Sequence, residues 1–264
     1  MFRKFSSSLL KLAQTRCSSS ASGMKKFYKV ASVVQVPDGQ FEVDLDSRKL
    51  KSPHGSILKF ENEALAHAVA HEWNSQPEDL KMHRLPLTNQ CFQATDRHVV
   101  PKKLAEALVN FVKTDTVLFF MDDVPELFEQ QKEKWGPVIE WVNKRFNVEV
   151  SHTTGFTMPK ISDNTVPVLT NHILSFNKAS LLSIEKMSAT LKSLMLTLAV
   201  IDRHLTCEEA VKLALLEQRF QASKWGHVEE FHDVELQEML MRCSACYVHI
   251  QMTNEVSTVK KQEH

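Results

Sequence analysis

The spacing of apolar residues changes near residue 60, and this change sets the kind of fold that the chain can adopt. Before it, apolar and polar residues alternate from Phe41 to Leu45, directly after the turn signal Pro37-Asp38-Gly39-Gln40, which is typical of a β-hairpin. After it, Leu65, Val69 and Trp73 recur at every fourth position, as on one face of an amphipathic helix. We therefore expect an α+β protein, with a small N-terminal β-rich domain followed by a larger all-helical C-terminal domain.

Beyond residue 100 the sequence predicts helices almost throughout. Pro101 suits a first helical turn, where its missing N–H is not needed. Leu104, Leu108 and Phe111 are expected on one face of the helix that follows. Residues 125–146 are expected to form one or two helices, with Pro137 beginning or kinking the second. The other expected helices cover residues 61–76, 166–176, 180–201, 206–226 and 228–251.

The expected domain boundaries follow from these elements. Residues 24–60 form the β-rich domain, which extends to about residue 98 if its helix and loop are counted with it. Residues 99–252 form the helical domain, and residues 253–264 form a polar tail. About 240 residues suffice for one large domain or two small ones.

Residues 1–23 have the composition of a mitochondrial transit peptide. No Asp or Glu occurs from Met1 to Pro37, and the first 23 residues are basic and rich in serine, as transit peptides are. A secretory signal would need an apolar stretch of about 7–15 residues, which Lys11 interrupts. The alternative is a basic tail. We expect cleavage between Arg16 and Lys25, with loss of Cys17, and a location in the mitochondrial matrix.

The charge of the chain argues against a nucleic-acid partner. Removing residues 1–23 takes away four of the 32 basic residues and none of the 32 acidic ones, which leaves 28 basic residues and a mildly acidic protein. No basic surplus remains to neutralise a phosphate backbone. The longest strongly apolar run, Leu191 to Ile201, is interrupted by Lys192 and is far shorter than the roughly 20 residues that span a bilayer, so no transmembrane segment is expected.

The commonest catalytic loop motifs are missing from the sequence. The six glycines lie at least 16 positions apart, so no two of them can share one loop. This excludes the dinucleotide-binding GxGxxG, the phosphate-binding GxxxxGK[ST] and the GxSxG nucleophile motif, each of which needs clustered glycines.

The nearest approach to a metal site is the pair His67 and His71, which share one helix face. In HExxH a glutamate follows the first histidine and acts as general base, but here Ala68 fills that position and Glu72 follows the second histidine. We interpret the pair as ordinary histidines beside the apolar stripe. No metal ligand and no cofactor are therefore expected.

The cysteines and two acidic clusters offer weaker signals. Cys243 and Cys246 form a CxxC without a second pair, so we interpret them as small residues one helical turn apart. The four cysteines that remain after processing are too scattered for a disulfide framework. Asp122-Asp123 and the cluster Glu229-Glu230-Phe231-His232-Asp233 fit acidic first turns of helices, although the second cluster also has the groups for acid–base chemistry.

Several short motifs follow one another in a characteristic order over residues 25–250. They are Lys26-Phe27-Tyr28-Lys29, the stretch from Val43 through Ser52-Pro53, Glu72-Trp73-Asn74-Ser75-Gln76, Leu85-Pro86-Leu87-Thr88, Asp96, Thr114-Asp115, Gln131 with Trp135, Lys192-Ser193-Leu194, and the stretch from Glu217 to Gly226 followed by Glu229-Glu230. In these motifs the chain resembles the mitochondrial ATP synthase assembly factor 2 family. It departs at Ser47, where the family commonly has glycine, and at His227-Val228, where many relatives carry an acid.

The resemblance implies a chaperone and not an enzyme. Family members are understood to bind the unassembled α subunit of the ATP synthase catalytic sector in the matrix, to prevent its aggregation and to hand it on to the β subunit, without a small-molecule substrate. Two other readings remain open: a metal-dependent or acid–base enzyme using His67, His71 or the His232 cluster, and a permanent structural subunit of a matrix complex.

The partner-binding residues are expected on and just beyond one helix. A capping box, Thr206-Cys207-Glu208-Glu209, opens this helix and Gly226 ends it. Leu213, Leu216 and Phe220 lie toward one side of it. The hypothesis assigns partner binding to five residues, three at i+4 spacing and two beyond the glycine: Glu217, Gln221, Trp225, Glu229 and Glu230. Trp73 and Gly226 are expected to be structural, and no catalytic residue is assigned.

Overall fold

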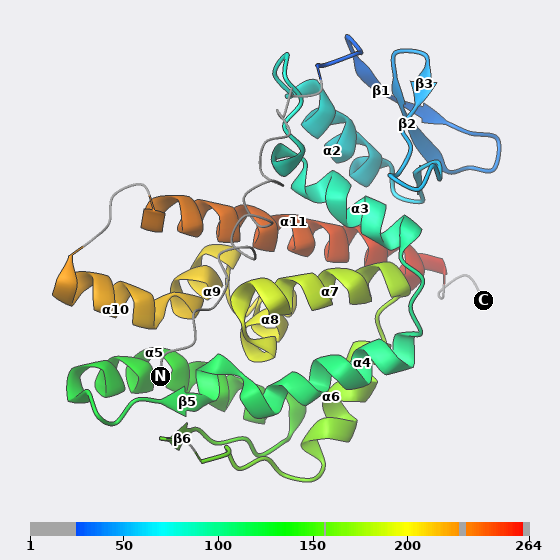
Figure 1. Cartoon of the computed structure of the whole chain (residues 1–264). Helices are drawn as coiled ribbons and strands as arrows, with labels where there is room; N and C mark the ends of the chain where they lie inside the picture. Colours follow the sequence, from blue (N-terminus) through cyan, green and yellow to red (C-terminus); the bar gives the residue numbers. More distant parts are fainter. Residues whose placement is uncertain (1–24, 156, 227–230, 261–264) are drawn as a thin grey trace, which may run out of the picture.

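The computed structural model describes residues 25–155, 157–226 and 231–260, and it confirms the α+β class. Figure 1 shows a small β unit at one side of the molecule and a larger group of helices beside it. The expected transit peptide, residues 1–23, lies outside the described residues.

The β unit is built on the predicted hairpin. Strand β1 (Ala31–Gln35) pairs antiparallel with β2 (Phe41–Leu45), so that Val33 lies opposite Val43. The short strands β3 (Arg48–Lys49) and β4 (Lys59–Phe60) both pair with β2. Gly39 in the turn has a φ of +82°, a conformation that glycine adopts without steric cost.

Helix α2 (Glu63–Asn74) packs against this sheet, as the apolar spacing predicts. Its stripe of Leu65, Val69 and Trp73 is buried. The Asn62 side chain caps its first turn by accepting a hydrogen bond from the Leu65 N–H at 3.2 Å. The local sequence thus determines both the start of this helix and the face that it buries.

A second helix of this unit, α3 (Pro86–Asp96), was not predicted. It follows the short 3₁₀ segment η1 (Met82–Arg84) and has Pro86 in its first turn. Its N-terminus is capped from another helix, because the Glu72 carboxylate accepts hydrogen bonds from the N–H groups of Leu87 and Thr88, each at 2.8 Å. Burial raises the pKa of Glu72, and these hydrogen bonds oppose that shift. A cap supplied by a distant residue leaves no local signal.

The helical unit begins with α4 (Pro101–Asn110), which starts at the predicted proline. The expectation for Phe111 is wrong, because the chain tightens into the 3₁₀ segment η2 (Phe111–Thr114) and leaves Phe111 61 % exposed, while Val112 is buried. A second 3₁₀ segment, η3 (Thr116–Leu118), leads into strand β5 (Phe119–Phe120), which pairs in parallel with β6 (Thr153–Thr154). Between these strands, α5 (Pro125–Phe146) is one helix that contains Pro137.

Two predicted helices are each divided in the structure. Helix α6 (Thr165–Leu174) lies near its predicted place. Residues 180–201 were expected as one helix, but they are divided between α7 (Lys178–Leu191) and α8 (Leu194–Ile201), with Lys192 at a φ of +53° between the two. The Ser193 side chain caps α8. Buried Asp115 also accepts a hydrogen bond from the N–H of Met195 at 3.0 Å. These contacts outweigh the continuous apolar pattern that predicts one helix.

The second division falls after the capping box, which the structure confirms: Thr206 and Glu209 cap each other's backbone at the start of α9 (Cys207–Ala214). The chain turns at buried Leu215 and continues as α10 (Leu216–Trp225). Gly226, with a φ of +100°, ends α10 as predicted.

The last helix, α11 (Phe231–Lys260), joins the two units and runs past its expected end at residue 251. It lies between α3 and α7 (Figure 1) and packs against both. Cys243, Cys246 and Ile250 belong to the core of the helical unit, whereas Ala245 belongs to the core of the β unit. Between them, the His249 Nδ1 lies 2.9 Å from the Ser183 hydroxyl of α7.

Within residues 25–155, 157–226 and 231–260, no helix has the length and apolar character needed to cross a membrane.

Candidate partner-binding site

Motif residues that are far apart in the sequence meet in pairs in the structure. The Tyr28 hydroxyl donates a hydrogen bond to the backbone carbonyl of Trp73 at 2.7 Å, and the two rings pack edge to face with centroids 5.6 Å apart. The indole N–H of buried Trp135 likewise donates to the Leu213 carbonyl at 3.0 Å. The first contact joins the segment before β1 to α2, and the second joins α5 to α9.

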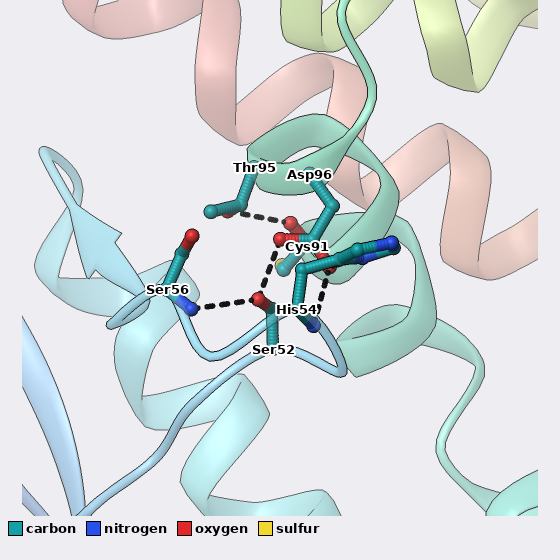
Figure 2. A network of polar contacts seen from close by, with 6 residues as sticks. All are labelled: Ser52, His54, Ser56, Cys91, Thr95 and Asp96. Atoms are coloured by element: carbon teal, nitrogen blue, oxygen red, sulfur yellow. Dashed lines mark hydrogen bonds and ion pairs between the residues drawn. The ribbon is translucent and has the colours of Figure 1, made fainter.

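A serine, a histidine and an aspartate meet at the junction of the β unit and α3 (Figure 2). The Ser52 hydroxyl lies 2.5 Å from one carboxylate oxygen of Asp96, and His54 Nδ1 lies 2.8 Å from the other. The hydrogen bond from Ser52, followed by those from His54, holds the pKa of Asp96 below its usual value. A serine nucleophile is activated when its hydroxyl bonds to a histidine that an acid orients. Here Ser52 and His54 each bond to Asp96 instead, so the three residues fasten the loop between β3 and β4 to α3.

Helix α10 carries the predicted partner-binding stripe. It packs against α5 and α9 and lies at the edge of the molecule (Figure 1). Phe220 is its one buried residue. Gln221 is exposed, and Trp225 at the end of the helix has 81 % of its surface exposed. Because tryptophan side chains are highly buried on average, an exposed tryptophan at a helix end is a candidate contact residue.

Glu217, the first residue of the stripe, is half-buried and anchored. Its Oε1 accepts a hydrogen bond of 2.8 Å from Nε2 of Gln131, a fully buried residue of α5. The Gln131 Oε1 accepts a second hydrogen bond, also of 2.8 Å, from the N–H of Met121. Burial raises the pKa of Glu217, and the hydrogen bond from Gln131 opposes the shift. Glu217 thus fixes the first turn of α10, the base of this helix, to α5.

A second connection fixes the last turn of α10. Lys224 forms an ion pair with Glu126 in the first turn of α5. The Lys224 ammonium also lies over the ring of Phe220, 5.5 Å from its centroid. Together with the Gln131–Glu217 bond, these contacts orient α10 so that Trp225 faces outward. Gln131 is one of the motif residues, but its position in the sequence does not indicate this contact, and Glu126 lies outside the motifs.

A groove lies between α10 and the beginning of α11. It has a volume of about 410 Å³, and its lining residues include Leu215, Arg219, Ala222 and Leu236. Glu229 and Glu230, the other two predicted contact residues, lie outside the described residues, and the structure gives no position for them.

Comparison with known proteins identifies the family. The family model described as "ATP12 chaperone protein" matches residues 25–143. The chain belongs to the ATP12 chaperone family. This confirms the resemblance found in the motifs.

Two curated ATP12 relatives match over most of their length. The mitochondrial protein atp12 of Schizosaccharomyces pombe is 29 % identical over 228 residues, covering 81 % of this chain and 78 % of its own. The mitochondrial protein ATP12 of Saccharomyces cerevisiae is 25 % identical over 264 residues, covering 83 % of this chain and 81 % of its own.

A solved ATP12 structure shares the fold. The crystal structure of Atp12 from Paracoccus denitrificans is 26 % identical with a TM-score of 0.76, covering 87 % of this chain and 98 % of that one. The ATP12 family model ends before α10, but the pairwise matches cover four fifths or more of the chain. The protein is thus an assembly chaperone of the ATP12 family.

The other candidate sites of the sequence analysis lie apart from α10. His67 and His71 are both exposed on α2, and His67 lies 3.7 Å from the Glu63 carboxylate. Asp122 and Asp123 are exposed in the turn before α5. In the part of the chain that the structure describes, no group of three or more His, Cys, Asp or Glu residues could hold a metal ion. The side chain of His232 lies outside the described part.

Proposed function

We propose that this ATP12 protein binds the unassembled α subunit of the ATP synthase catalytic sector in the mitochondrial matrix, prevents its aggregation and hands it on to the β subunit. Membership of a chaperone family and relatives named as mitochondrial proteins support this function. The main support from the structure is the exposure of Trp225, which has 81 % of its surface exposed on a helix that one hydrogen bond and one ion pair hold against α5.

The physical task of such a chaperone explains this arrangement. A subunit without its neighbour exposes an apolar patch that promotes aggregation. A rigid tryptophan covers apolar surface with little loss of conformational freedom, and tryptophans dominate binding energy in many interfaces. Because one indole on a narrow helix covers only a small area, the rest of the interface is left polar. A polar, modest interface gives way to the larger permanent interface with the β subunit.

We assign the stripe of α10 and the acids beyond Gly226 to this interface. In this assignment Trp225 and Gln221 contact the partner, and Glu217 holds α10 in register and adds negative charge. Glu229 and Glu230 extend the acidic surface that meets basic groups of the α subunit. The binding site then belongs to the helical domain, residues 99–252, and the β-rich domain braces it through α11.

The direct test measures how well the purified protein keeps unassembled α subunit in solution. Light scattering of the diluted α subunit is followed with wild-type protein, with Trp225→Ala and with Phe111→Ala. Phe111 is a matched control, because it is an aromatic residue that is 61 % exposed at the end of α4. Wild type and Phe111→Ala should suppress scattering, whereas Trp225→Ala should need at least about tenfold more protein, which corresponds to about 1.4 kcal/mol of binding. Equal suppression by all three proteins would remove Trp225 from the site, and no suppression by wild type would reject the function.

A further inference from the structure

Strand β1 forms one edge of the sheet in the β unit, because it pairs with β2 alone. Two backbone hydrogen bonds of 2.9 Å mark the ends of this pairing. At one end the Asp46 N–H donates to the Val30 carbonyl, and at the other the Val36 N–H donates to the Gln40 carbonyl. Because bonded pairs alternate along an antiparallel ladder, every second residue of β1, starting from Ala31, turns its backbone N–H and C=O away from β2.

The three outward positions of β1 are Ala31, Val33 and Gln35. A side chain of α2 satisfies the first: Asn74 donates through Nδ2 to the Ala31 carbonyl and accepts through Oδ1 from the Ala31 N–H, both at 2.8 Å. The N–H and C=O groups of Val33 and Gln35 point in the same direction as those of Ala31. Within residues 25–155, 157–226 and 231–260 they have no hydrogen-bond partner. The edge therefore offers two free donors and two free acceptors.

The sequence of this edge does not protect it. Edge strands usually carry lysine or proline, are bulged, or are covered by another segment, because free backbone groups accept an additional strand. No charged residue occurs from Val30 to Val36, and Val34 is exposed. The free groups end at Pro37, which has no N–H. Such an edge can bind an extended chain through backbone hydrogen bonds.

The charge beside the edge indicates which strand would fit. Glu42 and Asp44 lie on the outer face of β2, which is the face opposite to buried Val43. Lys49 forms an ion pair with Glu42. In the described part of the chain the Asp44 carboxylate has no hydrogen bond or ion pair, although its Oδ1 is buried. Ser32 lies opposite Asp44 on β1, so only a small side chain separates Asp44 from the free edge.

An added strand would place every second side chain on this outer face. A lysine or arginine next to Ser32 could then reach across the serine to Asp44. Such a residue would give the buried carboxylate oxygen the partner that it lacks, which offsets the cost of its burial. The edge thus fits an extended segment with a basic residue.

We propose that the free edge of β1 binds an extended segment of the unassembled α subunit as an additional strand, with a basic residue of that segment beside Ser32. This inference rests on the proposed function, because it takes the α subunit as the client. Figure 1 shows β1 well apart from α10, so the edge is a second, separate contact. Each backbone group exchanges a hydrogen bond with water for one with the client. Four such groups bind weakly enough to release the client to the β subunit.

The test measures hydrogen exchange of the β1 amides, residue by residue, in the free full chain and in its complex with purified unassembled α subunit. In the free chain the amides of Ser32 and Val34, which bond to β2, should exchange slowly, and those of Val33 and Gln35 quickly. In the complex the amides of Val33 and Gln35 should slow by at least about tenfold. Sedimentation establishes separately whether the complex forms. Absence of the complex would reject the proposed function, whereas a complex with fast exchange at Val33 and Gln35 would reject the edge alone.

A matched pair of variants tests the same contact by affinity. Gln35→Pro removes an outward N–H and leaves the ladder with β2 intact, whereas Gln35→Ala keeps the N–H. Thermal unfolding verifies that both fold. Gln35→Ala should bind the α subunit like wild type, and Gln35→Pro at least about fivefold more weakly. Equal affinity of the two folded variants would contradict the proposal.

Two further results would overturn it. Slow exchange of the Val33 and Gln35 amides in the free chain at low concentration would mean that residues 1–24 of the same chain already occupy the edge. Slow exchange that appears only as the concentration of the free chain rises would mean that a second copy occupies it. Both are read from wild-type protein, so the test stands even if Gln35→Pro does not fold.

Discussion

Gln131 and Glu217 are 86 residues apart in the chain, yet their side chains share a hydrogen bond of 2.8 Å. Because Gln131 also accepts from the Met121 N–H, one buried amide connects the turn before α5, the body of α5 and the base of α10. The outward position of Trp225 thus depends on a residue that never reaches the surface.

Gln131→Ala should destabilise the fold and loosen α10. The change removes both hydrogen bonds and leaves the Met121 N–H without its partner, which costs about 1–3 kcal/mol. Denaturant unfolding measures the loss. Gln130→Ala is the matched control, because Gln130 is the exposed neighbour on the same helix and should change stability by less than about 0.5 kcal/mol. Equal stability of the two variants would contradict the role given to Gln131.

Glu217→Lys should impair ATP synthase assembly in cells that depend on the introduced protein. The substitution places a positive charge beside the Gln131 amide, which can then no longer donate to residue 217, and it reverses the charge on the proposed surface. Glu217→Gln separates the two effects, since a glutamine still accepts the hydrogen bond but carries no charge. Recovery of assembly by Glu217→Lys to the wild-type level would remove Glu217 from the site.

The same substitution should have opposite consequences at two tryptophans. Trp73 is 5 % exposed between α2 and the sheet, so Trp73→Arg loses a packed indole and buries a charge, at a cost of about 3–5 kcal/mol or more. Trp225→Arg, at an exposed position, should leave the unfolding temperature nearly unchanged while weakening partner binding. Thermal unfolding of the two variants compares them directly, and a stable Trp73→Arg protein would refute the structural role of Trp73.

Stability should fall as the pH is lowered below about 6.5, in part because of His249. Burial lowers the pKa of His249 to about 4. Since the unfolded chain binds this proton first, the contribution of His249 is present above the usual histidine value of about 6.5 and is lost progressively toward pH 4. The shift corresponds to roughly 3 kcal/mol at most.

The comparison that isolates this effect uses His249→Gln, which keeps a hydrogen-bonding side chain beside Ser183 but does not titrate. Buried Asp115 acts in the opposite direction, because burial raises its pKa to about 6 and folding then favours its protonated form. The contribution of Asp115 is common to both proteins and cancels. The free energies of unfolding of wild type and His249→Gln should therefore differ in slope between pH 6.5 and 4, and parallel curves would show that His249 does not titrate as inferred.

Elements with local signals could be predicted from the sequence. The hairpin follows from alternation around Gly39, α2 from the spacing of Leu65, Val69 and Trp73, and the start of α9 from its capping box. Helix α3 could not be predicted, because Glu72 caps it from another helix. The division at Lys192 was missed because the apolar pattern continues through it, although Ser193 caps α8 locally and distant Asp115 adds a second hydrogen bond.

The candidate site shows the same limit. The i+4 spacing places Glu217, Gln221 and Trp225 on one stripe of α10, and the structure leaves the last two exposed. Spacing within one helix cannot reveal that Gln131 of another helix binds Glu217. This is a contact between helices, which depends on packing and not on local sequence.

Binding of the unassembled α subunit can be measured by a pull-down from matrix extract in which ATP synthase assembly is arrested. With tagged wild-type protein as bait, we predict strong enrichment of unassembled α subunit without β subunit, reduced at least tenfold with Trp225→Ala and unchanged with Phe111→Ala. Recovery of the finished ATP synthase at fixed stoichiometry, or no enrichment of the α subunit, would contradict the proposed function.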